Sequence, residues 1–190
     1  MKKRIMVGAS GASGMPLLTC CLEIIKKQPE YESQLIMTES AKLTIRQELC
    51  VEPEEIARLA DFYYEPQEIG APPASGTYPT AGMLIVPCSM KTVAGIHSGY
   101  SDNLLLRAAD VTLKEKRPLV LAARETPLSP VHLRNLYELS MIPEVRIIPP
   151  MLTFYHKPET MDEMVYHMAA KLLEPFGIYA KEYRRWNGLL

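Results

Sequence analysis

The sequence lacks the features of several large classes of protein. The basic start at residues 2–4 leads into an apolar stretch too short for a signal peptide, and no other apolar run could span a bilayer. We therefore expect a cytoplasmic protein with no membrane partner. An excess of one charge is also missing, because 21 Lys and Arg offset 22 Asp and Glu, and the basic residues are dispersed. This distribution argues against a nucleic-acid partner, which would need a basic stripe.

Cysteine is scarce as well. Of the four cysteines, Cys20 and Cys21 are neighbours on a predicted helix, whereas Cys50 and Cys88 are isolated. This arrangement supports neither a disulfide framework nor a zinc site, so we expect reduced thiols, most of them buried. The four histidines also lack the spacing of metal ligands. We therefore expect no bound metal.

Apolar side chains, by contrast, are abundant and regularly placed. They make up 47% of the 190 residues, which is enough to bury the core of one domain covering residues 1–190. Apolar runs predict strands at 4–7, 34–38, 83–87, 118–123 and 145–148. Periodicity and capping predict helices at about 17–25, 39–49, 53–61, 102–115, 129–141 and 160–172. This alternation is typical of α/β proteins, so we expect a Rossmann-like (flavodoxin-like) three-layer sandwich with a mostly parallel sheet.

Three of these helices have recognisable starts. Asp102 can cap the helix that runs to about 115, and Ser129 with Pro130 supplies a cap and a first-turn proline for the next. Thr160 with Glu163 forms a capping-box pattern. The core-facing stripe of that last helix is predicted to comprise Met161, Met164, Val165, Met168 and Leu172. Residues 66–80 contain four prolines and two glycines, and predict a long ordered loop over the edge or mouth of the sheet.

A glycine loop follows the first predicted strand. Its spacing, Gly8, Gly11 and Gly14, matches neither the GxGxxG of dinucleotide folds nor the GxxxxGK[ST] of P-loops. Because it lies between a strand and a helix, its backbone N–H groups can still hold an anion or a polar ring edge, with the hydroxyl of Ser10 or Ser13 as a further donor. A tight turn of small residues is the simpler alternative.

The second predicted strand ends at Thr38. Dinucleotide folds usually place an acidic residue there for the ribose, so a mononucleotide fits this sequence better, although the adjacent Glu39 weakens the exclusion. Ligands of open parallel sheets bind beyond the carboxyl ends of the strands. The segments at 8–14, 88–92, 124–125 and 149–155 all follow strands, and we expect the binding site among them.

Charged residues suggest a second part of the site. Lys91, Arg107 and Lys114 form a basic set, and the last two lie seven apart on one face of a predicted helix. An ordinary amphipathic helix with surface cations explains this spacing equally well. Arg124 and Glu125 follow a buried strand, where a carboxylate among cations could act as acid or base toward a phosphate leaving group. A structural ion pair is the alternative.

Other polar residues have simple explanations when taken alone. Glu48 ends a predicted helix and would be called a solvent-facing charge, while Tyr155 would be called a core tyrosine. Lys171 borders the apolar stripe and would snorkel. Cys88 and Ser89 have no neighbouring His and Asp arrangement, so the sequence does not predict nucleophilic catalysis.

Several short strings, in order along nearly the whole chain, resemble the UbiX flavin prenyltransferase family, including the forms called B subunits of phenolic-acid decarboxylases. They lie at 8–12 (GASGA), 87–92 (PCSMKT), 102–111, 113–115 (LKE), 119–121, 124–128 (RETPL), 154–155 and 185–186. The resemblance implies an enzyme that binds reduced FMN and transfers a dimethylallyl group to it from dimethylallyl phosphate, closing a ring across N5 and C6. It also implies that prenylated FMN passes to a UbiD-type decarboxylase. Members assemble into homo-oligomers, commonly dodecamers, with sites near subunit interfaces.

The resemblance also implies roles for individual residues. Flavin contacts fall on Gly8, Ala9, Ser10, Thr38, Cys88, Ser89, Met90, Lys91 and Arg124. Prenyl-phosphate contacts fall on Arg107, Lys114, Tyr155 and Lys171, and the catalytic group comprises Glu125 as the acid or base with Ser10, Glu48 and Lys114.

Three features depart from the family pattern. Thr38 stands where many members have serine, Lys171 stands where many have arginine, and the loop after Gly11 and Ala12 continues with Ser-Gly-Met-Pro. A lysine cannot reproduce a bidentate phosphate clamp, so affinity for the prenyl phosphate is the property most affected. Two other functions are compatible with the fold. One is a non-catalytic FMN-binding subunit of a phenolic-acid decarboxylase, and the other is a flavin-dependent cysteine decarboxylase, whose Asn-containing motifs and active-site histidine are missing.

Overall fold

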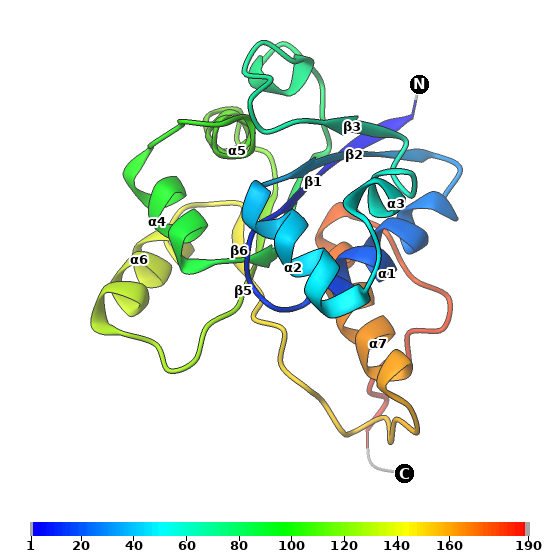
Figure 1. Ribbon diagram of the computed structural model, residues 1–190. Coiled ribbons are helices and arrows are strands. Elements are labelled where there is room, and N and C mark those ends of the chain that lie inside the picture. Colours follow the sequence, from blue (N-terminus) through cyan, green and yellow to red (C-terminus); the bar gives the residue numbers. More distant parts are fainter. Residues whose placement is uncertain (1, 189–190) are drawn as a thin grey trace.

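A single parallel sheet organises the chain (Figure 1). The computed structural model describes residues 2–188, so residues 1 and 189–190 of the expected domain and tail lie outside the described residues. The sheet has six strands in the order β3-β2-β1-β4-β5-β6, and each neighbouring pair is parallel. The strands are β1 (Lys3–Ala9), β2 (Tyr31–Met37), β3 (Phe62–Tyr64), β4 (Gly82–Cys88), β5 (Leu119–Ala123) and β6 (Val145–Ile147).

Helices cover both faces of this sheet, as the alternation of strands and helices predicts. One face carries α1 (Met15–Lys26), α2 (Glu39–Leu49), α3 (Pro53–Ala57) and α7 (Met161–Leu173), packed on one buried cluster. The other face carries α4 (Met90–Ser98), α5 (Leu104–Lys114) and α6 (Pro130–Ser140), packed on a second cluster. Side chains of β1 alternate between the two clusters, since Ile5 and Val7 belong to the first and Met6 to the second. The predicted three-layer α/β fold is confirmed.

Two elements have no counterpart among the predicted ones. β3 has only three residues at the sheet edge, and its Phe62 is 50% exposed, so no apolar pattern marks it. α4 begins directly after β4, where the Ser89 hydroxyl accepts a hydrogen bond from the backbone N–H of Thr92, and it ends at Gly99 in the left-handed conformation. The sequence pattern predicts no separate helix between the strand at 83–87 and the helix at 102–115, and α4 fills that interval.

Helix caps agree with the sequence in part. Asp102 does not cap α5, because Asn103 does so by accepting from the backbone N–H of Leu106 at 3.0 Å. Ser129 caps α6 as predicted. Thr160 caps α7, but the Glu163 carboxylate accepts from the N–H of Glu159 instead of closing the box.

The predicted apolar stripe of α7 is only partly buried. Leu172 lies in the core, whereas Met161 is 66% exposed, and the buried face comprises Ala169, Ala170, Leu172 and Leu173. The expectation of mostly buried thiols holds for Cys21 and Cys88, while Cys50 is exposed. Burial raises the pKa of the partly buried Cys20 thiol to about 11, helped by the nearby Glu23 carboxylate.

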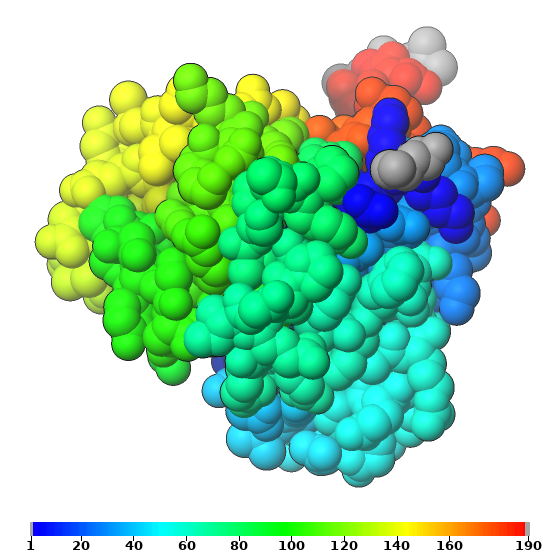
Figure 2. Space-filling view, turned by 90° about the horizontal axis from the view of Figure 1, so that it is seen from above, coloured from blue at the N-terminus to red at the C-terminus, as the bar shows by residue number. Residues whose placement is uncertain are grey.

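The 66–80 loop is ordered, as the sequence predicts, and contains a short 3-10 helix at Pro72–Ala74. It runs beside α5: the N–H of Leu104, in the first turn, donates to the carbonyl of Pro66 at 2.8 Å, and Gly76 lies against the Lys114 head group in the last turn. Figure 2 shows this loop, in teal and green, across the middle of one face of the molecule. Within residues 2–188, no helix is long and apolar enough to cross a membrane.

Candidate active site

Ser10 joins the carboxyl ends of two adjacent strands. Its side chain is 2% exposed, and its hydroxyl donates to the carbonyl of Pro87 at 3.1 Å and accepts from the backbone N–H of Ser89 at 2.8 Å. The residues predicted to contact flavin after β1 and after β4 therefore meet. Because the Ser10 hydroxyl donates its hydrogen bond to the Pro87 carbonyl, Ser10 organises the glycine loop instead of offering a free donor.

The glycines of this loop are required by close packing. A Cβ on Gly8 would lie 3.1 Å from Cδ1 of Leu105, and a Cβ on Gly11 would overlap the side chain of Ser40 in the first turn of α2. The loop is thus pressed against α2 as well as against α5. Residues without a side chain are therefore favoured at both positions, which keeps the loop backbone close to α2 and α5.

Glu48 occupies the N-terminus of α1. Its Oε2 accepts hydrogen bonds from the N–H groups of Gly14 at 2.9 Å and Met15 at 2.8 Å. Partial burial would raise the pKa of this carboxyl, but hydrogen bonds from Ser13, Gly14 and Met15 and the charge of Arg124 hold it below its ordinary value. The solvent-facing assignment of Glu48 is therefore wrong, and these two N–H groups of the loop already hold an internal anion.

Two other helices begin at the same edge. Thr38 caps α2, and its N–H donates to the carbonyl of Ala9 at 3.0 Å, so α2 starts beside the glycine loop. Ser89 caps α4 next to Ser10, with exposed Lys91 in the first turn. The positive ends of both helix dipoles therefore point to this edge. Because Glu48 already occupies the N-terminus of α1, the N-termini of α2 and α4 are the ones that suit a phosphate group.

Arg124 and Glu125 complete this edge. The N–H of Arg124 donates to the carbonyl of Cys88 at 3.0 Å, which places both residues directly beyond β4 and β5. The Glu125 carboxylate is exposed and accepts from the N–H of Thr126 at 3.0 Å. No ion pair joins Arg124 to Glu125 within residues 2–188, so the two side chains are available to ligands. The donors, the cation and the glycine cradle fit a phosphate-bearing mononucleotide such as FMN.

Arg107 and Lys114 lie elsewhere in the molecule. Arg107 donates from Nε to the carbonyl of Ala74 at 3.2 Å and from Nη1 to Asp110 at 2.6 Å, and Lys114 pairs with the adjacent Glu115. Lys114 ends α5 only five residues before β5 begins. It therefore lies at the amino ends of the strands, whereas the glycine loop lies at their carboxyl ends. These cations do not surround Glu125 within one chain.

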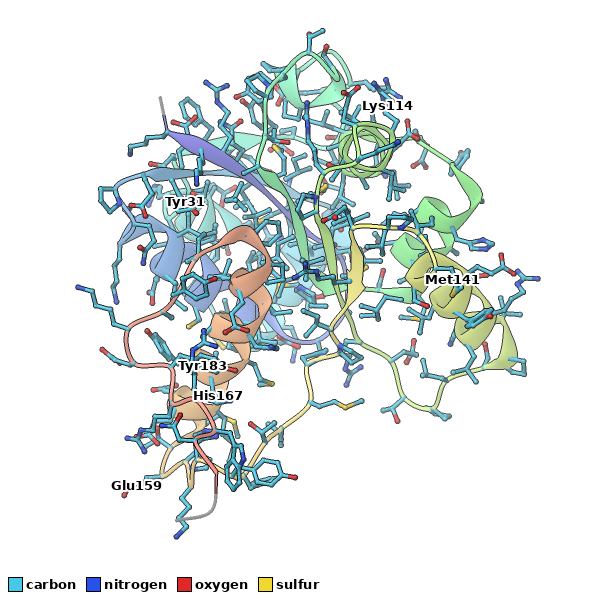
Figure 3. All side chains as sticks on the ribbon, turned by 180° about the vertical axis from the view of Figure 1, so that it is seen from behind. Tyr31, Lys114, Met141, Glu159, His167 and Tyr183 are labelled. Atoms are coloured by element: carbon cyan, nitrogen blue, oxygen red, sulfur yellow. The ribbon has the colours of Figure 1, made fainter. Side chains whose placement is uncertain are left out.

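Tyr155 and Lys171 form a third group. Tyr155 is 80% exposed and meets Trp186 edge-on at 5.6 Å between ring centroids, so the core-tyrosine alternative is wrong. The Lys171 ammonium lies 2.8 Å from Glu174, whose hydrogen bond raises the pKa of the lysine. Lys171 lines a cavity of about 190 Å³ between the segment after β6 and α7. Figure 3 places Lys114 at one end of the molecule and His167 and Tyr183, which line the same cavity as Lys171, toward the other.

The structure also places residues that the sequence did not single out. His156 and His167 stack with ring centroids 4.0 Å apart, and Tyr183 lies against His167 at 4.6 Å. The Tyr183 contact and the hydrogen bond from the N–H of Glu182 to the Tyr166 hydroxyl, at 3.4 Å, hold the tail, residues 179–188, against α7. Histidines eleven residues apart on different segments carry no periodic signal, so only the fold reveals the pair.

The fold and the edge beyond β1, β4 and β5 define an α/β protein whose helix N-termini suit a phosphate-bearing nucleotide. A family model described as Flavoprotein matches residues 1–172. A protein of Escherichia coli O157:H7 named probable UbiX-like flavin prenyltransferase is 46% identical over 186 residues, covering 98% of this chain and 94% of the relative. The chain belongs to the flavoprotein family and, within it, to the UbiX type.

Two solved structures are similar to this chain in three dimensions. A dodecameric FMN-dependent UbiX-like decarboxylase from Escherichia coli O157:H7 has a TM-score of 0.95 at 45% identity, covering 97% of this chain and 100% of that chain. AnUbiX (PadA1), solved in complex with FMN and dimethylallyl pyrophosphate, has a TM-score of 0.94 at 39% identity over 100% of both chains. The family predicted from the short strings is confirmed.

Proposed function

We propose that this protein transfers the dimethylallyl group of dimethylallyl phosphate to reduced FMN and so forms prenylated FMN. The observation that carries the proposal is the edge at which the glycine loop, the starts of α2 and α4, and the Arg124–Glu125 pair converge. The similarity to a protein solved with both FMN and dimethylallyl pyrophosphate supports it.

The residues at this edge and those of the two other groups would divide the work. Reduced FMN supplies the nucleophilic N5 and C6 atoms, and the flavin contacts are Gly8, Ala9, Ser10, Thr38, Cys88, Ser89, Met90, Lys91 and Arg124. Arg107, Lys114, Lys171 and Tyr155 bind the phosphate and stabilise its charge as the bond to the allylic carbon breaks. The exposed Glu125 carboxylate moves the proton that this substitution releases, toward the departing phosphate. Ser10 and Glu48 keep the loop in position.

The separation of the cations supports a site built from more than one copy of the chain. Arg107 and Lys114 lie on α5, whereas Lys171 and Tyr155 lie with α7 and the segment after β6. Lys114 lies at the other end of the molecule from His167 and Tyr183, which share the cavity of Lys171 (Figure 3), so we infer that a second copy brings the missing group to each site. We infer a homo-oligomer, with the dodecamer of the Escherichia coli relative as the expected form.

Mass spectrometry of the flavin tests the proposal. Purified protein incubated with reduced FMN and dimethylallyl phosphate should release a flavin heavier by one prenyl unit, and Glu125→Gln should retain FMN but lose this product. Glu138→Gln, on the exposed face of α6, is the matched control and should turn over normally. Unmodified flavin from the wild-type protein would favour the non-catalytic FMN-binding subunit, and full turnover by Glu125→Gln would remove that residue from the mechanism.

Prenylated FMN is a cofactor, so another enzyme must receive it from this protein. We propose that residues 1–190 act as one cytoplasmic domain that supplies prenylated FMN to a UbiD-type decarboxylase. Adding the reaction mixture to such a decarboxylase prepared without cofactor should restore aromatic-acid decarboxylation, and a mixture lacking dimethylallyl phosphate should not.

A further inference from the structure

Arg117 makes three hydrogen bonds to the 66–80 loop. Its Nη2 donates to the carbonyl of Gly76 at 2.8 Å, and its Nη1 donates to the carbonyl of Tyr78 at 2.9 Å and to Oγ1 of Thr80 at 3.1 Å. The side chain can reach the loop because Lys116 adopts the left-handed conformation, with φ of 54°, and turns the chain back after α5. A planar guanidinium with several donors is the side chain best suited to bridge neighbouring carbonyls.

The same loop holds the Arg107 side chain. Arg107 donates from Nε to Ala74 at 3.2 Å and from Nη1 to Asp110 at 2.6 Å. A guanidinium has five N–H donors, so these two bonds fix its plane and leave the others for a ligand. Gly76 lies directly against the Lys114 ammonium, which means that the position of the loop also sets the position of that cation.

Tyr78 anchors the far end of the loop. Its hydroxyl donates to Gln34 at 2.9 Å, and the Arg4 guanidinium lies over its ring, 4.6 Å from the centroid. Residues 75–80 lie between the contact at Ala74 and the end of the loop. In the part of the chain that the structure describes, Arg117 makes the only hydrogen bonds from α5 and its C-terminal turn to these residues. Without them the stretch between Ala74 and Tyr78 would depend on its two ends and could shift relative to Lys114.

We propose that Arg117 is a positioning residue for prenyl-phosphate binding: by holding the carbonyls of Gly76 and Tyr78, it fixes the loop that orients Arg107 and Lys114. The inference rests on the proposed function, since it takes these two cations as phosphate contacts. Arg117 itself points at the loop and not at the ligand, and it acts by keeping the cations in place before the substrate arrives.

The test compares steady-state kinetics of Arg117→Met and the wild type with dimethylallyl monophosphate as the varied substrate. We expect the KM to rise about tenfold, which corresponds to about 1.4 kcal/mol, while kcat changes less than twofold and the Kd for FMN stays constant. Arg117→Lys keeps the positive charge but replaces the guanidinium with a single ammonium group, so it should give an intermediate KM. A residue that only supports the fold would instead lower kcat, FMN affinity and thermal stability together, and that result would overturn the proposal.

A second variant covers the case in which Arg117→Met does not fold. A Cβ on Gly76 would overlap the Lys114 and Glu115 head groups, which are flexible enough to move, so Gly76→Ala should fold and still raise the KM. Arg58→Met, at the exposed arginine of the α3 C-cap, is the matched control and should leave the KM unchanged. An unchanged KM in the Arg117 or Gly76 variant of an active enzyme refutes the inference alone, whereas an inactive wild type refutes the proposed function.

Discussion

The hydroxyl of Ser10 and the backbone N–H of Ser89 are joined by a 2.8 Å hydrogen bond across 79 positions of sequence. This bond links the glycine loop after β1 to the start of α4, the two segments that are expected to hold the flavin. The geometry of the binding edge therefore depends on one buried hydroxyl.

Ser10→Ala should weaken FMN binding about tenfold. The substitution leaves the partly buried N–H of Ser89 without its partner, which costs about 1–3 kcal/mol, and weakens the link between the loop and α4. Flavin fluorescence titration measures the Kd. Ser140→Ala, an exposed serine on α6, is the control and should bind FMN normally. An unchanged Kd in Ser10→Ala would show that the loop keeps its shape without this link.

Glu48→Gln should lower the free energy of unfolding at neutral pH by about 1 kcal/mol, because it weakens a charged cap on α1. The pKa of Glu48 is lowered in the folded protein, so the wild-type carboxylate stabilises the fold above its ordinary value of 4.5 and loses that contribution as the pH falls through the folded pKa. Urea unfolding at fixed protein concentration should separate the two proteins at pH 7, and the difference should shrink as the pH falls below 4.5. Equal stability at pH 7 would contradict this role.

Lys171→Arg should tighten binding of the prenyl phosphate. The lysine offers a single ammonium head, whereas a guanidinium can hold two phosphate oxygens at once. We expect the KM for dimethylallyl phosphate to fall several-fold with kcat unchanged. Lys27→Arg, in the C-cap of α1, is the control for a change of cation far from the cavity. A higher KM in Lys171→Arg would mean that the 190 Å³ cavity is shaped for the smaller head.

Acid should loosen the tail through the His156–His167 stack. Burial and the neighbouring His156 lower the pKa of His167 from 6.5, while the Glu174 carboxylate acts in the opposite direction. Stability from the neutral ring is therefore complete above pH 6.5 and is lost as the pH falls below it. Trp186, the only tryptophan, lies in the tail against Tyr155, so its fluorescence should change between pH 7.5 and 5.5. The change should vanish in His167→Phe, and its persistence there would assign it to another group.

The sequence predicts much of this fold because buried strands are short apolar runs bounded by breakers. The same rule fails for β3, whose three residues pair with β2 through backbone bonds at an exposed edge. It also fails for α4, which the pattern does not predict as a separate helix although Ser89 is a normal cap. Local pattern does not distinguish a short element from the loop around it.

The part of the site that follows directly from the direction of the parallel strands was predictable from the sequence. Ser10, Thr38, Ser89 and Arg124 follow strands of a parallel sheet, and their meeting at one edge follows from topology. The contacts of Glu48 with Gly14 and of Arg117 with Gly76 join segments separated by more than thirty positions, and neither has a sequence signature. The remote position of Lys114, by contrast, was already implied by its place just before a strand.

The carboxylate of Glu48 at the start of α1 has a consequence for selectivity. In many nucleotide-binding α/β proteins the first glycine turn and the helix after it receive a diphosphate. Here the Glu48 carboxylate competes with such a phosphate for the N–H groups of Gly14 and Met15. Because it belongs to the same chain, its effective concentration is high. Abundant cellular dinucleotides and nucleoside triphosphates would have to displace it, so the protein can remain open to a mononucleotide in their presence.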